Sequence, residues 1–126
     1  MIADIFVSIA GDNLFFIYTV IVFFSVILSA FIDNIPYVAA MLPVVTSVAS
    51  TMSTDPTVLY FGLLVGATLG GNFTPIGASA NIAGIGILRK EGHKVNAATF
   101  MKVSVPFTIT AVLSGYILNW LIFGSL

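Results

Sequence analysis

The sequence predicts an all-α membrane protein, and three observations lead to that fold class. Of its 126 residues, 59% are hydrophobic and only 7% are charged, with a mean hydropathy of +1.13. A soluble domain carries about 25% charged residues, so this composition cannot cover a water-exposed surface. Apolar runs occupy 14–32, 58–88 and 97–123, and glycines and polar residues interrupt the second run. We expect one transmembrane domain over 1–126 with a re-entrant helical hairpin, one broken transmembrane helix and one long C-terminal transmembrane helix.

The hairpin is expected at about 14–50. Asp12-Asn13 is a helix N-terminal signal, and the uncharged run 14–32 that follows would form roughly 28 Å of helix. Asp33-Asn34-Ile35-Pro36 then turns the chain, because Asp and Asn side chains bond local backbone and proline disfavours helix in the residue before it. The apolar stretch 37–49 would give only about 20 Å of helix, which is short of a ~30 Å hydrocarbon core.

Two topologies fit this region of the sequence. Either two helices span fully, with Asp33 in the cytoplasm, or the tip of a re-entrant hairpin stops inside the membrane. Both topologies place 1–13 and 51–57 on the same side, so the distribution of charge does not separate them. The short second arm favours the hairpin. So does the tip, which has no Lys or Arg, whereas cytoplasmic loops carry an excess of both.

The broken helix is expected at about 58–88. Its middle reads Gly70-Gly71-Asn72-Phe73-Thr74-Pro75-Ile76-Gly77-Ala78-Ser79-Ala80-Asn81. Glycine weakens a helix by about 1 kcal/mol and proline by about 3 kcal/mol, so we expect 71–78 to be non-helical between two half-helices. Irregular backbone at membrane depth needs cover from protein or a cavity to line, and transporters use such breaks to bind ions and substrates. Gly62, Gly66 and Gly70 form a strip where another helix can approach closely.

Charge predicts the sidedness of a multi-pass protein in the cell membrane. All four basic residues, Arg89, Lys90, Lys94 and Lys102, lie in one window, and basic residues near span ends mark the cytoplasmic side. The loop 89–99 is therefore expected in the cytoplasm. The segments 1–13 and 51–57, which carry Asp4, Asp12 and Asp55 without Lys or Arg, are expected outside, as is the C-terminus.

Several function classes find little support in the composition. The chain has no cysteine, so it has neither disulfides nor thiolate metal ligands, and one histidine, His93, cannot form a multi-histidine site. We find no nucleophile–base pair and expect no enzymatic activity. We also expect no cofactor apart from bound Na⁺, and no nucleic-acid partner. The expected partners are the lipid bilayer and a small ion or anion.

Two polar clusters are expected at similar depth in the membrane. The hairpin tip supplies Ser29, Asp33 and Asn34, and the break supplies Asn72, Thr74, Ser79 and Asn81. These side chains offer hydroxyl, amide and carboxylate oxygens that suit a hard cation such as Na⁺, for which Asn34, Asn72 and Asn81 are the candidate ligands. The positive end of the second half-helix, near Ser79, would instead favour an anion. A plainer alternative is that Ser79 or Asn81 only caps a kinked helix.

Asp33 is the acid flanked on both sides by long apolar runs. An ionisable residue inside a membrane is costly, and its default interpretation is functional. We expect a low dielectric to disfavour its charged form and a bound cation to favour it, so that cation entry expels a proton. The alternative is a surface aspartate that caps a turn.

The segment Ser29-Ala30-Phe31-Ile32-Asp33-Asn34-Ile35-Pro36-Tyr37-Val38-Ala39-Ala40-Met41-Leu42-Pro43 resembles the second hairpin of the ion transporter superfamily. This superfamily contains ArsB/NhaD-type arsenite or sodium–proton antiporters and the related citrate and dicarboxylate transporters. The segment 70–81 looks like the unwound helix that follows the hairpin, and Glu91-Gly92-His93-Lys94 looks like its cytoplasmic exit. The resemblance covers about 14–123. It implies that the hairpin tip and the break face each other across an ion site, in a protein that is a homodimer when complete.

The resemblance extends to one half of the family pattern. Family members have two inverted halves and additional scaffold helices, and nothing here looks like the first hairpin. We therefore expect a C-terminal fragment, a separately encoded half or a shortened chain, whose partner is the missing N-terminal half or the scaffold. The implied function is part of a secondary active transporter, for Na⁺/H⁺ exchange or efflux of arsenite or another anion, coupled to H⁺ or Na⁺.

The tip Asp-Asn-Ile-Pro looks closer to the ArsB/NhaD-type antiporters than to the dicarboxylate carriers. Two alternatives stay open. One is a non-transporting membrane subunit or assembly partner that retains the fold. The other is a carrier that moves dicarboxylate or citrate with Na⁺.

Overall fold

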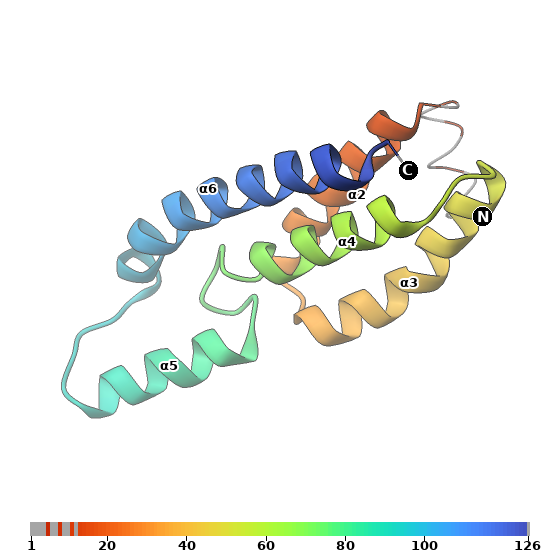
Figure 1. The fold of residues 1–126 in the computed structure, drawn as a ribbon. Helices are drawn as coiled ribbons and strands as arrows, with labels where there is room; N and C mark the ends of the chain where they lie inside the picture. The colour runs from red at the N-terminus through yellow and green to blue at the C-terminus, as the bar shows by residue number, and fades with distance from the viewer. Residues whose placement is uncertain (1–4, 6–7, 9–10, 12, 126) are drawn as a thin grey trace.

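A computed structural model describes Ile5, Ser8, Gly11 and 13–125. The secondary-structure elements in that part of the chain are all α-helices. The expectations for Asp4 and Asp12 lie outside the described residues. The helices, labelled as in Figure 1, are α2 (Leu14–Ser29), α3 (Asn34–Thr51), α4 (Thr57–Gly70), α5 (Ser79–Lys90) and α6 (Ala97–Phe123).

The helices form a three-helix group, one extended arm and one helix that runs along both. Figure 1 shows α4 between α3 and the C-terminal part of α6, with α2 also packed against α4 and with α5 diverging near the N-terminal part of α6. The turn between α2 and α3 and the break between α4 and α5 therefore lie near the middle of the molecule. With 14 and 12 residues, α4 and α5 have a summed helical length of about 39 Å, close to the roughly 40 Å of the 27-residue α6.

The glycine strip of α4 packs directly against α2, as the spacing of Gly62, Gly66 and Gly70 predicts. A Cβ atom added at Gly66 would lie 2.7 Å from Ser25 Cβ, and one added at Gly70 would lie 2.6 Å from Val26 Cα. Distances this short leave no room for a side chain. The two backbones can approach closely because these three positions carry none.

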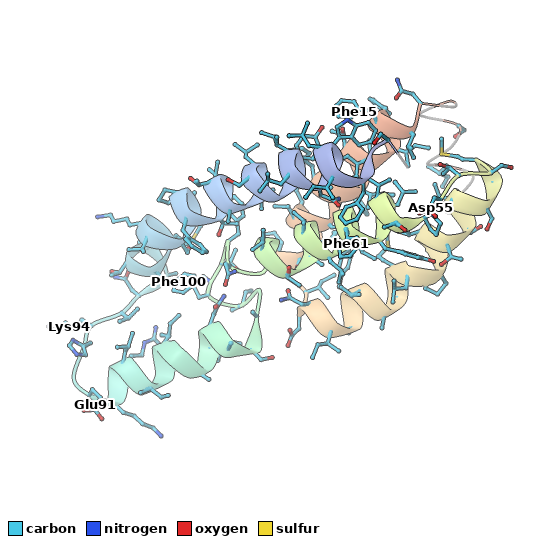
Figure 2. The ribbon with its side chains drawn as sticks, in the orientation of Figure 1. Phe15, Asp55, Phe61, Glu91, Lys94 and Phe100 are labelled. Carbon is cyan, nitrogen blue, oxygen red and sulfur yellow. The ribbon has the colours of Figure 1, made fainter. Side chains whose placement is uncertain are left out.

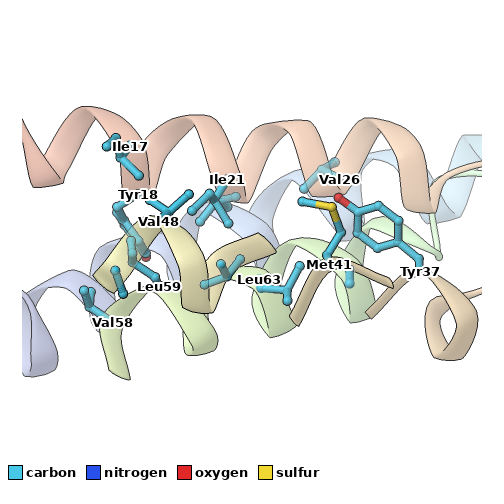
Figure 3. Packing of buried hydrophobic residues seen from close by; sticks show 14 of the residues in the cluster. Ile17, Tyr18, Ile21, Val26, Tyr37, Met41, Val48, Val58, Leu59 and Leu63 are labelled. Atoms are coloured by element: carbon cyan, nitrogen blue, oxygen red, sulfur yellow. The ribbon is translucent and has the colours of Figure 1, made fainter. Parts of the chain in front are cut away.

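The apolar core fills the space between α2, α3 and α4 (Figure 3). Its side chains come from all three helices, and Val112 joins them from α6. The largest fully buried apolar members are Ile17, Tyr18, Ile21, Val22, Val45, Val48, Leu59 and Leu63. In contrast, only Ile85 is buried in α5, so the core holds the hairpin against α4 and leaves α5 apart.

The region expected to form the hairpin contains two helices that run in opposite directions on either side of a turn (Figure 1), with lengths that differ from those expected. The first arm ends at Ser29 instead of residue 32, because Phe31 and Ile32 belong to the turn. The second arm begins at Asn34 and ends at Thr51, instead of covering 37–49. Pro36 occupies its first turn, where the missing N–H would have no helical partner, and the helix continues through the second proline, Pro43.

These lengths change the argument for a re-entrant hairpin. With 16 and 18 residues, α2 and α3 are about 24 and 27 Å long, so the second arm is not the short one that the sequence suggested. The argument for a re-entrant hairpin therefore rests on the position of the turn beside the break.

The last helix is confirmed at 97–123 and continues through Pro106. Among the described residues it is the helix long and apolar enough to cross a membrane, and α2 and α4 are shorter apolar helices. Asn96 caps its N-terminus by accepting a hydrogen bond from Thr99 N at 2.8 Å. Near its other end, Tyr116 stacks on Tyr18 of α2 with ring centroids 5.1 Å apart.

Candidate ion site where the hairpin tip meets the helix break

The break is non-helical over 71–78, as its glycines and proline predict. One side chain from the following helix holds it in place. The Asn81 amide nitrogen donates to Gly71 O at 3.0 Å and to Thr74 O at 3.1 Å. Both N–H groups of this amide therefore bind carbonyls that the interrupted helix leaves without helical partners. Asn81 thus stabilises the loop from within the first turn of α5.

The hairpin tip binds the end of α4 through a buried hydroxyl. Ser29 is fully buried, and its Oγ lies 2.7 Å from Asn34 Oδ1 and 2.5 Å from Ala67 O. The Asn34 oxygen in turn lies against Gly71, where an added Cβ would overlap it. Ser29 and Asn34, at the two ends of the turn, are therefore hydrogen-bonded to each other and lie against the start of the break.

Two further hydrogen bonds join the tip to the far side of the break. Thr74 Oγ1 donates to Ala30 O, and Ser79 Oγ donates to Asp33 Oδ2. Ser79 is the first residue of α5, so the half-buried Asp33 carboxylate lies at the positive end of that helix dipole. The anion that the sequence predicts for this helix end is therefore present in the chain itself, as Asp33.

Backbone carbonyl oxygens converge at Gly77. A Cβ atom added there would lie 2.5 Å from Gly71 O and 2.9 Å from both Ala30 O and Ser29 O. These oxygens come from the end of α2, the turn after it and the break. Each carbonyl has two lone pairs, so the bonds to Ala30 O and Gly71 O leave an acceptor site on each. Carbonyls freed by helix breaks are Na⁺ ligands in transporters.

Five of the seven candidate side chains take part in three hydrogen bonds at the tip and the break: Ser29 with Asn34, Asp33 with Ser79, and Thr74 with Ala30 O. Asn81 joins them indirectly, through its bonds to the loop backbone. Asn72 lies half-buried in the break and, with Asn81, lines a cleft of about 440 Å³ between α5 and α6. Of the three candidate Na⁺ ligands, Asn34 is therefore the one whose side chain lies between the tip and the break.

Sequence reasoning missed the backbone contribution of Gly71 and Gly77. In the sequence, glycine in the break indicates a helix breaker, whereas in the structure these two positions also admit neighbouring oxygens that a side chain would exclude. It also missed Ser104 of α6, whose Oγ donates to Phe73 O at 3.4 Å. The signal for Ser104 is a small polar residue in the middle of an apolar helix, and it does not identify the partner.

Comparison with known proteins decides the family. The family model described as "Citrate transporter" matches residues 1–126. The chain belongs to the citrate transporter family. This membership agrees with the resemblance of the hairpin and the break to the ion transporter superfamily, and it establishes a membrane protein of a transporter family.

Relatives of this citrate transporter family chain occur in bacteria and mammals. A "46 kDa membrane protein" of Mycobacterium leprae is 34% identical over 99 residues, which are 77% of this chain and 23% of that protein. An "Uncharacterized transporter" of Mycobacterium bovis is 34% identical over 116 residues, 90% of this chain and 27% of that protein. The "P protein" of Sus scrofa is 37% identical over 102 residues, 76% of this chain and 12% of that protein. The chain thus spans about a quarter or less of the length of these relatives, and no solved structure matches it.

Proposed function

We propose that this chain forms one half of the ion site of a secondary active transporter that exchanges Na⁺ or a small anion for H⁺. The observation that carries the proposal is the convergence of Ser29 O, Ala30 O and Gly71 O at Gly77. In this account the hairpin is re-entrant and its tip lies at membrane depth. The other half of the site comes from the remainder of the complete transporter, which forms a homodimer.

The residues present fit a monovalent hard cation. Three carbonyl oxygens, the Asn34 amide oxygen and the Asp33 carboxylate all lie where the tip contacts the break. One carboxylate among neutral oxygens gives a single negative charge, which balances one Na⁺. Such a set is unlike a typical calcium site, where several carboxylates commonly contribute.

Asp33 then couples the cation to a proton. Away from water, the carboxylate is costly unless a positive charge lies beside it. Its neighbour Ser79 donates a hydrogen bond, and the positive end of α5 also attracts the negative charge. A cation that enters from the tip side stabilises the negative charge further, in addition to the Ser79 hydrogen bond and the helix dipole. The carboxylate therefore releases its proton as the cation binds. Proton return expels the cation, which gives the exchange.

Membership of the citrate transporter family favours a second candidate, a carrier that moves citrate or a dicarboxylate together with Na⁺. The same oxygens would then bind the coupling Na⁺, with Asp33 as a permanently charged ligand. The two candidates differ in what Asp33 does: in the exchanger it gains and loses a proton in each cycle, and in the carrier it does not.

Transport by the complete protein in proteoliposomes tests both candidates. Na⁺, arsenite and citrate are compared as substrates under an imposed proton or sodium gradient, for the wild type and for Asp33→Asn. We expect transport that depends on pH in the wild type and has lost its pH dependence in Asp33→Asn. Citrate uptake driven by Na⁺ that is equally pH-independent in both proteins would instead support the carrier. No gradient-driven movement of any of the three would support a non-transporting subunit.

Asp55→Asn is the matched control. Asp55 is exposed in the loop between α3 and α4, and hydrogen bonds from the Thr57 side chain and backbone lower its pKa below the usual value. Asp55 therefore remains ionised over the pH range of the assay. We expect Asp55→Asn to transport like the wild type.

A further inference from the structure

The corner between α5 and α6 gathers positive charge around a cavity. Residues 89–96, which we call the basic corner, carry Arg89, Lys90 and Lys94 with one carboxylate, Glu91. Figure 2 shows Glu91 and Lys94 at the extreme end of the molecule. A cavity of about 360 Å³ is lined by Arg89, Lys94 and their neighbours in this corner.

The Arg89 guanidinium is held at this cavity. Its Nε donates to Val95 O at 2.8 Å, which uses one of its five N–H donors. The four that remain belong to the outer fork of the guanidinium, whose geometry matches the oxygens of a phosphate. The guanidinium of a solvent-exposed arginine without such a hydrogen bond would be less well oriented.

An apolar cleft adjoins the basic cavity. The cleft of about 440 Å³ between α5 and α6 is lined mainly by apolar side chains that include Leu88, Val103 and Phe107. Val95 lines both spaces, so the cleft begins where the basic cavity ends. Val103 is 74% exposed and Phe107 is 59% exposed, which leaves this side of the cleft open along α6.

We propose that the α5–α6 corner binds an anionic phospholipid, with its phosphate in the basic cavity and an acyl chain in the cleft. Charge complementarity selects the headgroup, because juxtamembrane clusters of Lys and Arg attract anionic lipid. The adjoining apolar cleft selects a lipid over a soluble anion, which would gain nothing from Val103 or Phe107. The basic cavity lies at the far end of α5 from the tip and the break, whereas the cleft extends from it to Asn72 and Asn81 of the candidate ion site.

Native mass spectrometry of the complete transporter in detergent tests the proposal. Phosphatidylglycerol is titrated against phosphatidylcholine for the wild type and for three variants. We expect phosphatidylglycerol to bind more tightly, and the double variant Arg89→Gln/Lys94→Gln to weaken that binding by about tenfold or more. Val103→Trp, which fills the cleft and retains every charge, should weaken it as well. Lys102→Gln removes one positive charge, outside both cavities, and should leave the affinity within about twofold.

Inorganic phosphate separates the headgroup from the whole lipid. Displacement of phosphatidylglycerol by millimolar phosphate, together with wild-type affinity in Val103→Trp, would show a phosphate site and overturn the lipid assignment. Equal binding of phosphatidylglycerol and phosphatidylcholine by the wild type would overturn the proposal without any variant. This result is expected if the remainder of the transporter fills the cleft. Weakening in Lys102→Gln that is as large per charge removed as in the double variant would show general attraction by charge, which also contradicts a site at this corner.

Discussion

At the scale of single residues, Asp33 occupies an unusual position for an acid in an apolar chain. It ends the turn after α2, precedes the first residue of α3, and receives a hydrogen bond from Ser79 of α5. Its side chain therefore links the turn between α2 and α3 to the start of α5. In the proposed exchanger, a change in the charge of this carboxylate would alter its attraction to the positive end of α5.

The sequence identifies the polar residues of the site better than their roles. Ser29, Asp33 and Asn34 are recognisable because they interrupt apolar runs, and the structure brings them to the break as expected. Asn81 is also recognisable, but its amide binds loop carbonyls. The carbonyls around Gly77 carry no signal, because every residue has a carbonyl and only the fold makes three of them converge.

At the scale of elements, the closest packing is between α2 and α4. Gly66 is the central position of the strip, where an added Cβ would overlap Val22 O and lie 2.7 Å from Ser25 Cβ. We expect Gly66→Ala in the complete transporter to lower the free energy of unfolding by about 1–3 kcal/mol, because overpacking shifts backbone as well as side chains. Thermal unfolding followed by size-exclusion chromatography measures the change.

Gly84→Ala is the control, because it also adds a methyl group to a helical glycine, but at a position without close packing. Gly84 lies within α5, and an added Cβ there meets no atom within 4 Å. Alanine favours helix over glycine by about 1 kcal/mol, so this variant should be as stable as the wild type or slightly more stable. Equal destabilisation by both substitutions would contradict the packing of α2 on α4.

The order and type of the helices could be predicted from the sequence, whereas the length of α3 could not. Proline disfavours helix in the residue before it, which predicts that this helix begins only after Pro36. Pro36 instead lies in the first turn, where proline is tolerated, and Asn34 and Ile35 are helical before it. The final helix is simpler to place, since Asn96 caps its start and Gly124 follows its end.

At the scale of the whole molecule, the two polar ends lie far apart. Figure 2 places Asp55 at one end and Lys94 at the other, with the turn and the break between them. The positive-inside rule assigns the end with Arg89, Lys90 and Lys94 to the cytoplasm. We therefore expect the loop at Asp55 and the C-terminus to lie outside.

Cysteine labelling in cells tests this topology. The chain has no cysteine of its own, so Asp55→Cys and His93→Cys each introduce one thiol into it. We expect an impermeant reagent to label Asp55→Cys from outside the cell and His93→Cys only after the membrane is opened. Labelling of both thiols from the same side would refute the sidedness and the single crossing by α4 and α5.

Binding of radioactive Na⁺ to the complete transporter is the most direct test of an ion site between the hairpin tip and the break. Gly77→Ala is compared with Gly84→Ala, since each adds one methyl group but only the first adds it among Gly71 O, Ala30 O and Ser29 O. Both variants must elute as folded protein. We predict that Gly77→Ala weakens Na⁺ binding by about tenfold or more, while Gly84→Ala binds like the wild type. Wild-type Na⁺ affinity in folded Gly77→Ala would contradict the site.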